Sequence, residues 1–104
     1  MQTYEFDWTE FTERTLKTIH YKHCIEEDEL IGFVPVTVGN DTYIVDIHYY
    51  NYDSKDRGFD LEVYKSNKDL YHLSWLGNIK DIKSATDYNR FCRRAENLII
   101  SLIS

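Results

Sequence analysis

The sequence predicts an α+β domain of order α-β-β-β-β-α, a four-stranded antiparallel meander with N- and C-terminal helices packed on one face. Two patterns support this prediction. Four segments between residues 30 and 76 alternate apolar with polar side chains, as half-buried strands do. Segments at both ends of the chain repeat apolar residues at helical spacing. With 104 residues, the chain is long enough for one domain (1–104) with a single core.

The predicted N-terminal helix covers residues 8–24. Asp7 is a good N-cap, Glu10 lies three residues further on as in a capping box, and Phe6 and Phe11 occupy hydrophobic-staple positions. The apolar stripe of this helix consists of Trp8, Phe11, Thr15, Leu16, Ile19 and His23. The acidic run 26–29 that follows is expected to be a solvated loop.

Residues 42–52 form the predicted central strand, because their odd positions from Tyr43 to Tyr49 are all apolar or aromatic. Gly39-Asn40 predicts a two-residue hairpin turn from a preceding strand, 30–38. This turn sets Val36 opposite Tyr43, so the valines join the apolar face of the central strand. Pro35 lacks a backbone donor, which predicts that strand 30–38 lies at the sheet edge.

The remaining strands are predicted at 59–65 and 70–76, the second with Tyr71, Leu73 and Trp75 pointing inward. A final helix is expected from Ser84, with Asp87 three residues on, nearly to the end. Its stripe is Tyr88, Phe91, Cys92, Ala95, Leu98, Ile99 and Leu102. The expected core comprises Tyr43, Val45, Ile47, Leu61, Leu73, Phe91, Leu98 and Ile99.

The net charge of −6 argues against non-specific binding to nucleic acid or anionic membranes, both of which need basic patches. It favours a basic protein partner instead. The sequence has no apolar run long enough to span a membrane and no secretory signal at its start, so a cytoplasmic location is expected. The two cysteines, Cys24 and Cys92, are not closely spaced and are expected to be reduced thiols, with Cys92 in the core.

The face of the sheet opposite the helices is unusually rich in aromatic and acidic side chains. It is expected to carry Phe33, Thr37, Ile44, Asp46, His48, Tyr50, Tyr52, Asp60, Glu62, Tyr64, His72 and Ser74. Tyrosines and carboxylates together suit recognition of a basic protein. The predicted partner-binding residues are Asp46, His48, Tyr50, Tyr52, Asp60, Glu62 and Tyr64. A homodimer surface, or aromatic pairs that merely stabilise the sheet, are the alternatives.

A metal-dependent hydrolase or nuclease is a competing hypothesis, with Asp46, His48, Glu62 and His72 as candidate ligands. A nuclease of the PD-(D/E)XK kind would need a lysine one residue earlier than Lys65, which falls on the opposite strand face. His20 and Cys24 lie one predicted helical turn apart, as metal ligands can. Structural roles explain these histidines better, because the helix dipole favours a histidine near a helix C-terminus and His23 lies on the apolar stripe. We therefore expect no catalytic residue, metal or cofactor.

Arg90, Arg93 and Arg94 form a basic patch on the outer side of the last helix, too small to indicate nucleic-acid binding in an acidic chain. No phosphate-binding glycine loop or hydrolase motif occurs. A compact, acidic, tyrosine-rich domain without a catalytic motif is typical of small inhibitor and immunity-type proteins. These include bacteriophage anti-defence proteins that block host nucleases.

Overall fold

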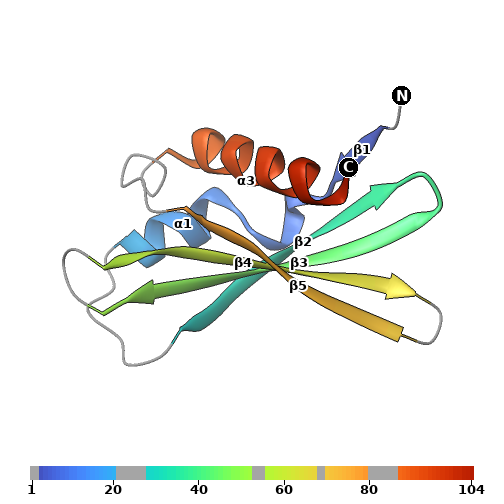
Figure 1. Cartoon of the computed structure of the whole chain (residues 1–104). Helices are drawn as coiled ribbons and strands as arrows, with labels where there is room; N and C mark the ends of the chain where they lie inside the picture. The colour runs from blue at the N-terminus through green and yellow to red at the C-terminus, as the bar shows by residue number, and fades with distance from the viewer. Residues whose placement is uncertain (1–2, 21–27, 53–55, 68–69, 80–86) are drawn as a thin grey trace.

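The computed structural model describes residues 3–20, 28–52, 56–67, 70–79 and 87–104. It has the α+β class that the sequence predicts, with an antiparallel sheet and a helix near each end (Figure 1). The described strands form one sheet in the order β1-β2-β3-β4-β5. The elements are β1 (Tyr4–Phe6), a 3-10 helix η1 (Trp8–Glu10), α1 (Glu13–His20), β2 (Glu29–Val38), β3 (Asp41–Asn51), β4 (Arg57–Asn67), β5 (Leu70–Ile79) and α3 (Tyr88–Ile103).

The hairpin between β2 and β3 has the predicted register. Val36 pairs with Tyr43, and Val34 pairs with Val45. Gly39, in the turn, has a φ of 61°, a conformation that two-residue turns require and glycine adopts without strain. The predicted register is therefore confirmed. It could be predicted because turn chemistry and side-chain alternation specify the same register.

The prediction of four strands is wrong, because Tyr4–Phe6 forms a fifth strand, β1, that pairs with the C-terminal part of β2. β2 is therefore not an edge strand along its whole length. Pro35 is nevertheless compatible with its place: its carbonyl accepts the N–H of Asp7, so its backbone polar groups face β1. The nitrogen of Pro35, which has no hydrogen to donate, thus faces the side where β1 ends. The hydrogen bonds between β2 and β3 do not need a donor at this position.

The N-terminal helix is shorter than predicted. Asp7 is an N-cap as expected and accepts the N–H of Thr9, but it caps the 3-10 helix Trp8–Glu10. Phe11 then adopts an extended conformation, with φ of −140°, and ends that helix before α1 begins. This break inserts the Phe11 ring fully into the core, a tertiary contact that outweighs the local helical pattern. Residues 21–24 of the predicted helix lie outside the described residues.

The C-terminal helix α3 has the expected apolar stripe. Phe91, Cys92, Ala95 and Ile99 are buried. Leu102, the last residue of the predicted stripe, is exposed. Asp87 caps the helix by accepting the N–H of Arg90, so the described helix begins at Tyr88; Ser84, the predicted start, lies outside the described residues.

β5 runs further than predicted, and its side chains alternate differently. Leu61 pairs with Gly77 and Glu62 with Trp75, which leaves Leu76 as an extra residue in a β-bulge. Trp75 therefore lies opposite Glu62 rather than in the core, and its side chain is 61% exposed. The prediction that Trp75 points inward is wrong, because one extra residue reverses the face for the part of the strand before it.

The core lies between the sheet and the two helices, which both contribute buried residues to it. Its centre is aromatic: the centroid of the Phe91 ring lies 5.0 Å from the centroid of the Phe11 ring and 4.9 Å from that of the Phe59 ring. Gly32 makes this arrangement possible, because a Cβ there would come within 2.9 Å of Phe11. Of the predicted core, Val45, Ile47, Leu61, Phe91 and Ile99 are buried, Tyr43 and Leu98 are partly buried, and the side chain of Leu73 lies outside the described residues.

The alternation of β3 can be tested by comparing two isoleucines. Ile47 is fully buried, so Ile47→Ala should lower the free energy of unfolding by about 2–5 kcal/mol in chemical denaturation. Ile44 lies on the other face and is partly exposed, so Ile44→Ala should cost about 1 kcal/mol or less. Equal losses for the two variants would contradict the assignment of faces.

Candidate functional site

The sheet face opposite the helices brings together most of the predicted binding residues. In the register of β3 and β4, Asp46 lies opposite Glu62 and His48 opposite Asp60. The next pair along the strands is Ile44 and Tyr64. We call Asp46, His48, Asp60, Glu62 and Tyr64 the acidic face. The side chains of all five are partly exposed, and the α-helices α1 and α3 pack on the other side of the sheet (Figure 1).

The charges within the acidic face are crowded. His48 Nε2 lies 3.3 Å from Glu62 Oε2 and is the cationic counterpart to the carboxylates when protonated. Burial raises the pKa of Asp46, and the charge of Glu62 raises it further, while His48 acts in the opposite direction. Burial, followed by the charges of Asp46 and Glu62, also raises the pKa of Tyr64. Within the described part of the sheet, these carboxylates therefore crowd one another, and the charge of His48 acts against that of the carboxylates.

Asp28 extends the acidic face, although its place in the acidic run 26–29 predicts a solvated loop. The hydroxyl of Tyr52 donates a hydrogen bond to Asp28, and this bond is the main reason that the pKa of Tyr52 rises to about 12. Burial, then a hydrogen bond with Asp28 and its charge, raise the pKa of Asp60 to about 6. The pairing of Glu29 with Tyr49 carries Asp28 to this end of the sheet, a long-range contact without a local sequence signal.

Tyr50 has a supporting position at this end of the sheet. Its side chain is 4% exposed and lies 5.8 Å from the Tyr52 ring, measured between ring centroids. It packs closely against Gly58, where a Cβ would lie 2.9 Å from the Tyr50 hydroxyl. Burial raises the pKa of Tyr50 to about 12. A side chain this buried can hold its neighbours in place, but it offers little surface to a partner.

The structure does not gather the full set of candidate metal ligands. The register pairs His72 with Lys65 and Ser74 with Val63, so neither strand position belongs to the face of Asp46 and Glu62. The bulge at Leu76 is the reason, and the prediction that His72 and Ser74 lie on the open face is wrong at the level of the strand register. Within the described residues, no group of three or more His, Cys, Asp or Glu is arranged to hold a metal ion.

Lys65 lies on the helix side of the sheet, as its odd position in β4 predicts. Its Nζ is 5.8 Å from the centroid of the Tyr43 ring and 3.9 Å from Asp41 Oδ2. The lysine that a nuclease motif would place beside Glu62 is therefore on the other side of the sheet. The alternative pair, His20 and Cys24, cannot be placed, because Cys24 and the side chain of His20 lie outside the described residues.

The remaining candidates are separate from the acidic face. Arg90, Arg93 and Arg94 are exposed on α3, on the helix side of the sheet. Cys92 is buried on the same helix, and burial raises the pKa of its thiol to about 11. A thiol with this pKa stays protonated near neutral pH and is a poor nucleophile, which agrees with a role in the core.

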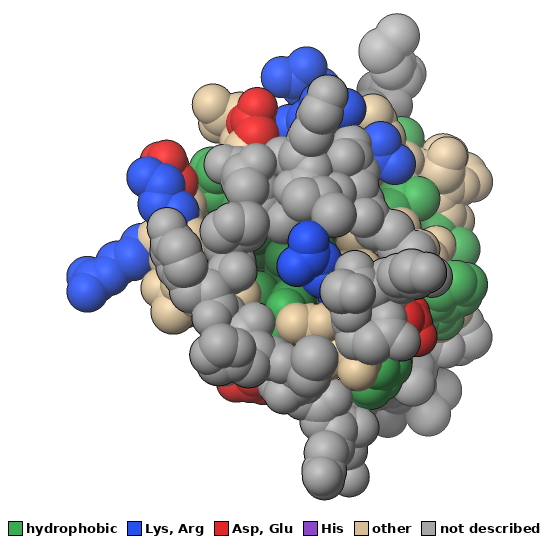
Figure 2. Space-filling model, turned by 90° about the vertical axis from the view of Figure 1, so that its left-hand side faces the viewer, with side chains coloured by type: hydrophobic (Ala, Val, Ile, Leu, Met, Phe, Trp, Pro, Cys, Tyr) green, Lys and Arg blue, Asp and Glu red, His purple; other side chains and the backbone are tan. Residues whose placement is uncertain are grey.

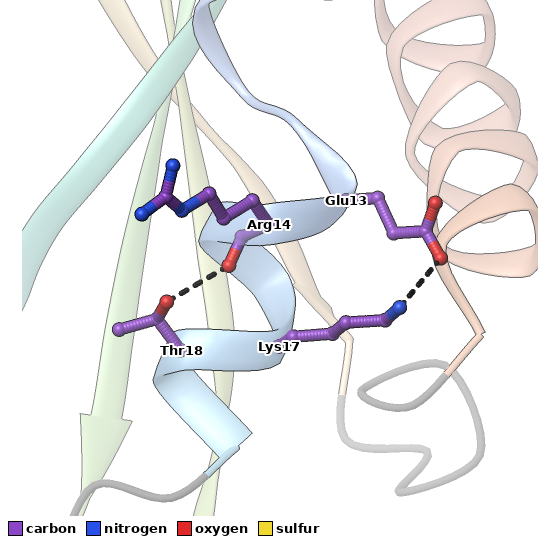
Figure 3. Close-up of a pocket in the computed structure, with 4 residues that line it drawn as sticks. All are labelled: Glu13, Arg14, Lys17 and Thr18. Carbon is purple, nitrogen blue, oxygen red and sulfur yellow. Dashed lines mark hydrogen bonds and ion pairs between the residues drawn. The ribbon is translucent and has the colours of Figure 1, made fainter.

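A wide pocket beside α1 was not expected from the sequence. Its described lining residues are Glu13, Arg14, Lys17 and Thr18 (Figure 3). Lys17 Nζ lies 3.1 Å from Glu13 Oε1, and the Thr18 hydroxyl donates to the carbonyl of Arg14 at 2.9 Å. Figure 2 shows this end of the molecule, where lysine and arginine side chains lie close to acidic ones. Because Glu13 and Lys17 pair with each other and Thr18 bonds to the backbone, the described lining suggests no particular ligand.

No protein-family model matches the chain, and comparisons with curated proteins and with solved structures found no significant match. Among the described residues, no helix is long and apolar enough to cross a membrane.

Burial and the nearby carboxylate of Asp28 predict that Asp60 makes the free energy of unfolding depend on pH. Since the pKa of Asp60 is raised to about 6, the folded chain keeps a proton that the unfolded chain releases near 3.8. This contribution to stability is present below pH 3.8 and is lost as the pH rises through 6. Asp60→Asn should therefore raise the free energy of unfolding by about 1 kcal/mol near pH ~8, after allowing for solvent screening.

At about pH 2.5, well below the unfolded-state pKa of 3.8, Asp60 is protonated in both states, so the same variant should match the wild type in urea denaturation. A gain that is equal at both pH values would show that the carboxylate charge is not responsible.

Proposed function

We propose that this protein is a non-enzymatic binder of a basic protein, of the inhibitor or immunity type, and that the acidic face is its binding surface. The observation that supports this most is the crowding of carboxylates on a sheet face that the described helices leave open. Asp46, Asp60 and Glu62 lie there on adjacent strands, with Asp28 beside them. A partner with lysine and arginine side chains would supply the missing positive charge.

The composition of the surface favours a cationic partner over a neutral one. No lysine or arginine occupies an open-face position of β3 between Thr42 and Tyr50, or of β4 between Gly58 and Tyr64. The raised pKa values of Asp46 and Asp60 mean that their ionised forms are disfavoured in the free protein. A cation placed against them would stabilise those forms, so charge complementarity would contribute to affinity as well as to the rate of association.

Three exposed or partly exposed aromatic side chains in and around the acidic face provide contact area. Tyr64 lies next to Asp46 and Glu62 in the sheet, and Trp75 lies opposite Glu62 on β5. Tyr52 is 46% exposed at the other end, beside Asp28. Tyrosine and tryptophan are enriched in protein interfaces because they bury large areas and lose little conformational freedom. We infer that carboxylates steer the partner and that these rings hold it.

Proteins that handle nucleic acids are a natural class of partner. Their binding surfaces are clusters of lysine and arginine that neutralise phosphates. A small acidic domain that occupies such a surface would compete with the nucleic acid, which is how an inhibitor of a nuclease can work without any catalytic residue. This function would suit an immunity protein or a bacteriophage protein that acts against a host defence nuclease.

The proposal predicts that binding depends on where the charge lies, not only on how much there is. A nona-arginine peptide serves as the probe, with affinity measured by isothermal titration calorimetry. Asp46→Asn with Glu62→Gln should weaken binding about tenfold, because both changes remove charge from the acidic face. The wild-type protein should lose affinity for the peptide as salt is added, because salt screens the exposed charges.

The control is the double variant Asp41→Asn with Glu13→Gln, which changes the net charge equally but on the helix side of the sheet. It should weaken binding less than about threefold. If the control weakens binding as much as the acidic-face variant, the peptide responds to net charge alone and the proposed surface is wrong.

A further inference from the structure

β5 is a long edge strand that carries no charged residue. In the described sheet it forms the outer strand next to β4, and no described strand pairs with its other side (Figure 1). The opposite edge is covered in part by β1, which has 3 residues, whereas β5 has 10. Its sequence, Leu-Tyr-His-Leu-Ser-Trp-Leu-Gly-Asn-Ile, contains no Asp, Glu, Lys, Arg or Pro.

Proteins commonly protect an exposed edge with charges, proline, a bulge or a short strand. β5 has one of these devices, the bulge at Leu76. On the N-terminal side of the bulge, the pairing from Trp75 to Leu70 is regular. This half of the edge is therefore a regularly paired strand with no Asp, Glu, Lys, Arg or Pro to oppose further pairing.

The direction of the free backbone groups follows from the hydrogen-bond pattern. Pro35 bonds toward β1, so Val34 and its partner Val45 bond to each other. Alternation across the antiparallel ladder then directs the polar groups of Val63 and Ser74 toward each other. The N–H and C=O groups of Leu73 and Trp75 consequently point away from β4, along the unpaired edge.

We propose that two copies of this chain associate through β5, with the two strands antiparallel and the two sheets joined into one. The occupant is a second copy because the pairing is self-complementary: a two-fold axis brings the Leu73 and Trp75 backbone groups of each copy to the same groups of the other. Charge supports the same choice. Each chain has a net charge of −6, so copies repel one another over most of their surface, and β5 is a stretch at which that repulsion is small.

Trp75 adds an apolar contact at the same place. Its side chain is 61% exposed, beside the outward-facing backbone groups of its own residue. A two-fold axis perpendicular to the sheet keeps the acidic faces of both copies on one side. The dimer would thus display two acidic faces together, although the association itself does not depend on the proposed function.

The test is the molecular mass of the full chain in solution, measured by light scattering after size-exclusion chromatography under reducing conditions. The wild type should have twice the 12.5 kDa mass of the chain. Trp75→Lys places a charge on the edge and should give a monomer. Leu30→Lys is the matched control: Leu30 is 56% exposed on β2, and β3 and β4 separate that strand from β5, so this variant should stay dimeric.

Hydrogen exchange of the wild type provides a second measurement in case Trp75→Lys does not fold. The amides of Leu73 and Trp75 should exchange about tenfold more slowly in concentrated than in dilute samples, because only the dimer protects them. A wild type that is monomeric at every concentration would overturn the proposal. So would a dimer that Leu30→Lys disrupts and Trp75→Lys does not, or amides of Leu73 and Trp75 that exchange equally fast in samples that light scattering shows to be dimeric and monomeric.

Discussion

The register of the hairpin between β2 and β3 is the constraint on which the rest of the structure depends. The turn at Gly39 and Asn40 sets Val34 against Val45 and Val36 against Tyr43, so one face of β3 enters the core. β4 then continues the same alternation, with Ile47 opposite Leu61. The carboxylates of the acidic face reach the surface, where they are partly exposed, for the same reason that Val45, Ile47 and Leu61 are buried. A shift by one residue would put Asp46 in the core, where an unpaired charge is very costly.

This constraint was predictable because its causes are local. Turn type and a period of two can be read from neighbouring residues, and they agree for residues 34–47. The features that the sequence analysis missed depend on distant partners. Tyr4–Phe6 forms a strand because β2 offers it an edge, and Phe11 breaks a helical pattern because Gly32 leaves room for its ring. The bulge at Leu76 has a signal in Gly77, whose φ is 138°, but the sequence alone suggested a strand end there.

The candidate site was predictable to the same degree as the strands that carry it. Asp46, His48, Asp60 and Glu62 come together because β3 and β4 are regular and adjacent. Asp28 joins them through a contact 24 residues away in the sequence, and Trp75 reaches the same face through the bulge. The burial of Tyr50 could not be foreseen, since it depends on the close approach of Gly58. Site residues whose positions depend on regular strand pairing could be predicted. Those whose positions depend on a bulge or on long-range contacts could not.

The central claim is that one face of β3 is a solvent-accessible, negatively charged surface while the other is core. Paramagnetic relaxation by two small nitroxides of similar size, one neutral and one cationic, tests both parts in a single NMR experiment. The neutral probe should relax the Ile44 methyl groups and leave those of Val45 and Ile47, which are fully buried, unaffected. The cationic probe should relax Ile44 and the amides of Glu62 and Tyr64 more strongly than the neutral one, because the carboxylates concentrate it. Equal effects of the two probes on these residues, or relaxation of Val45 and Ile47 as strong as that of Ile44, would contradict the account.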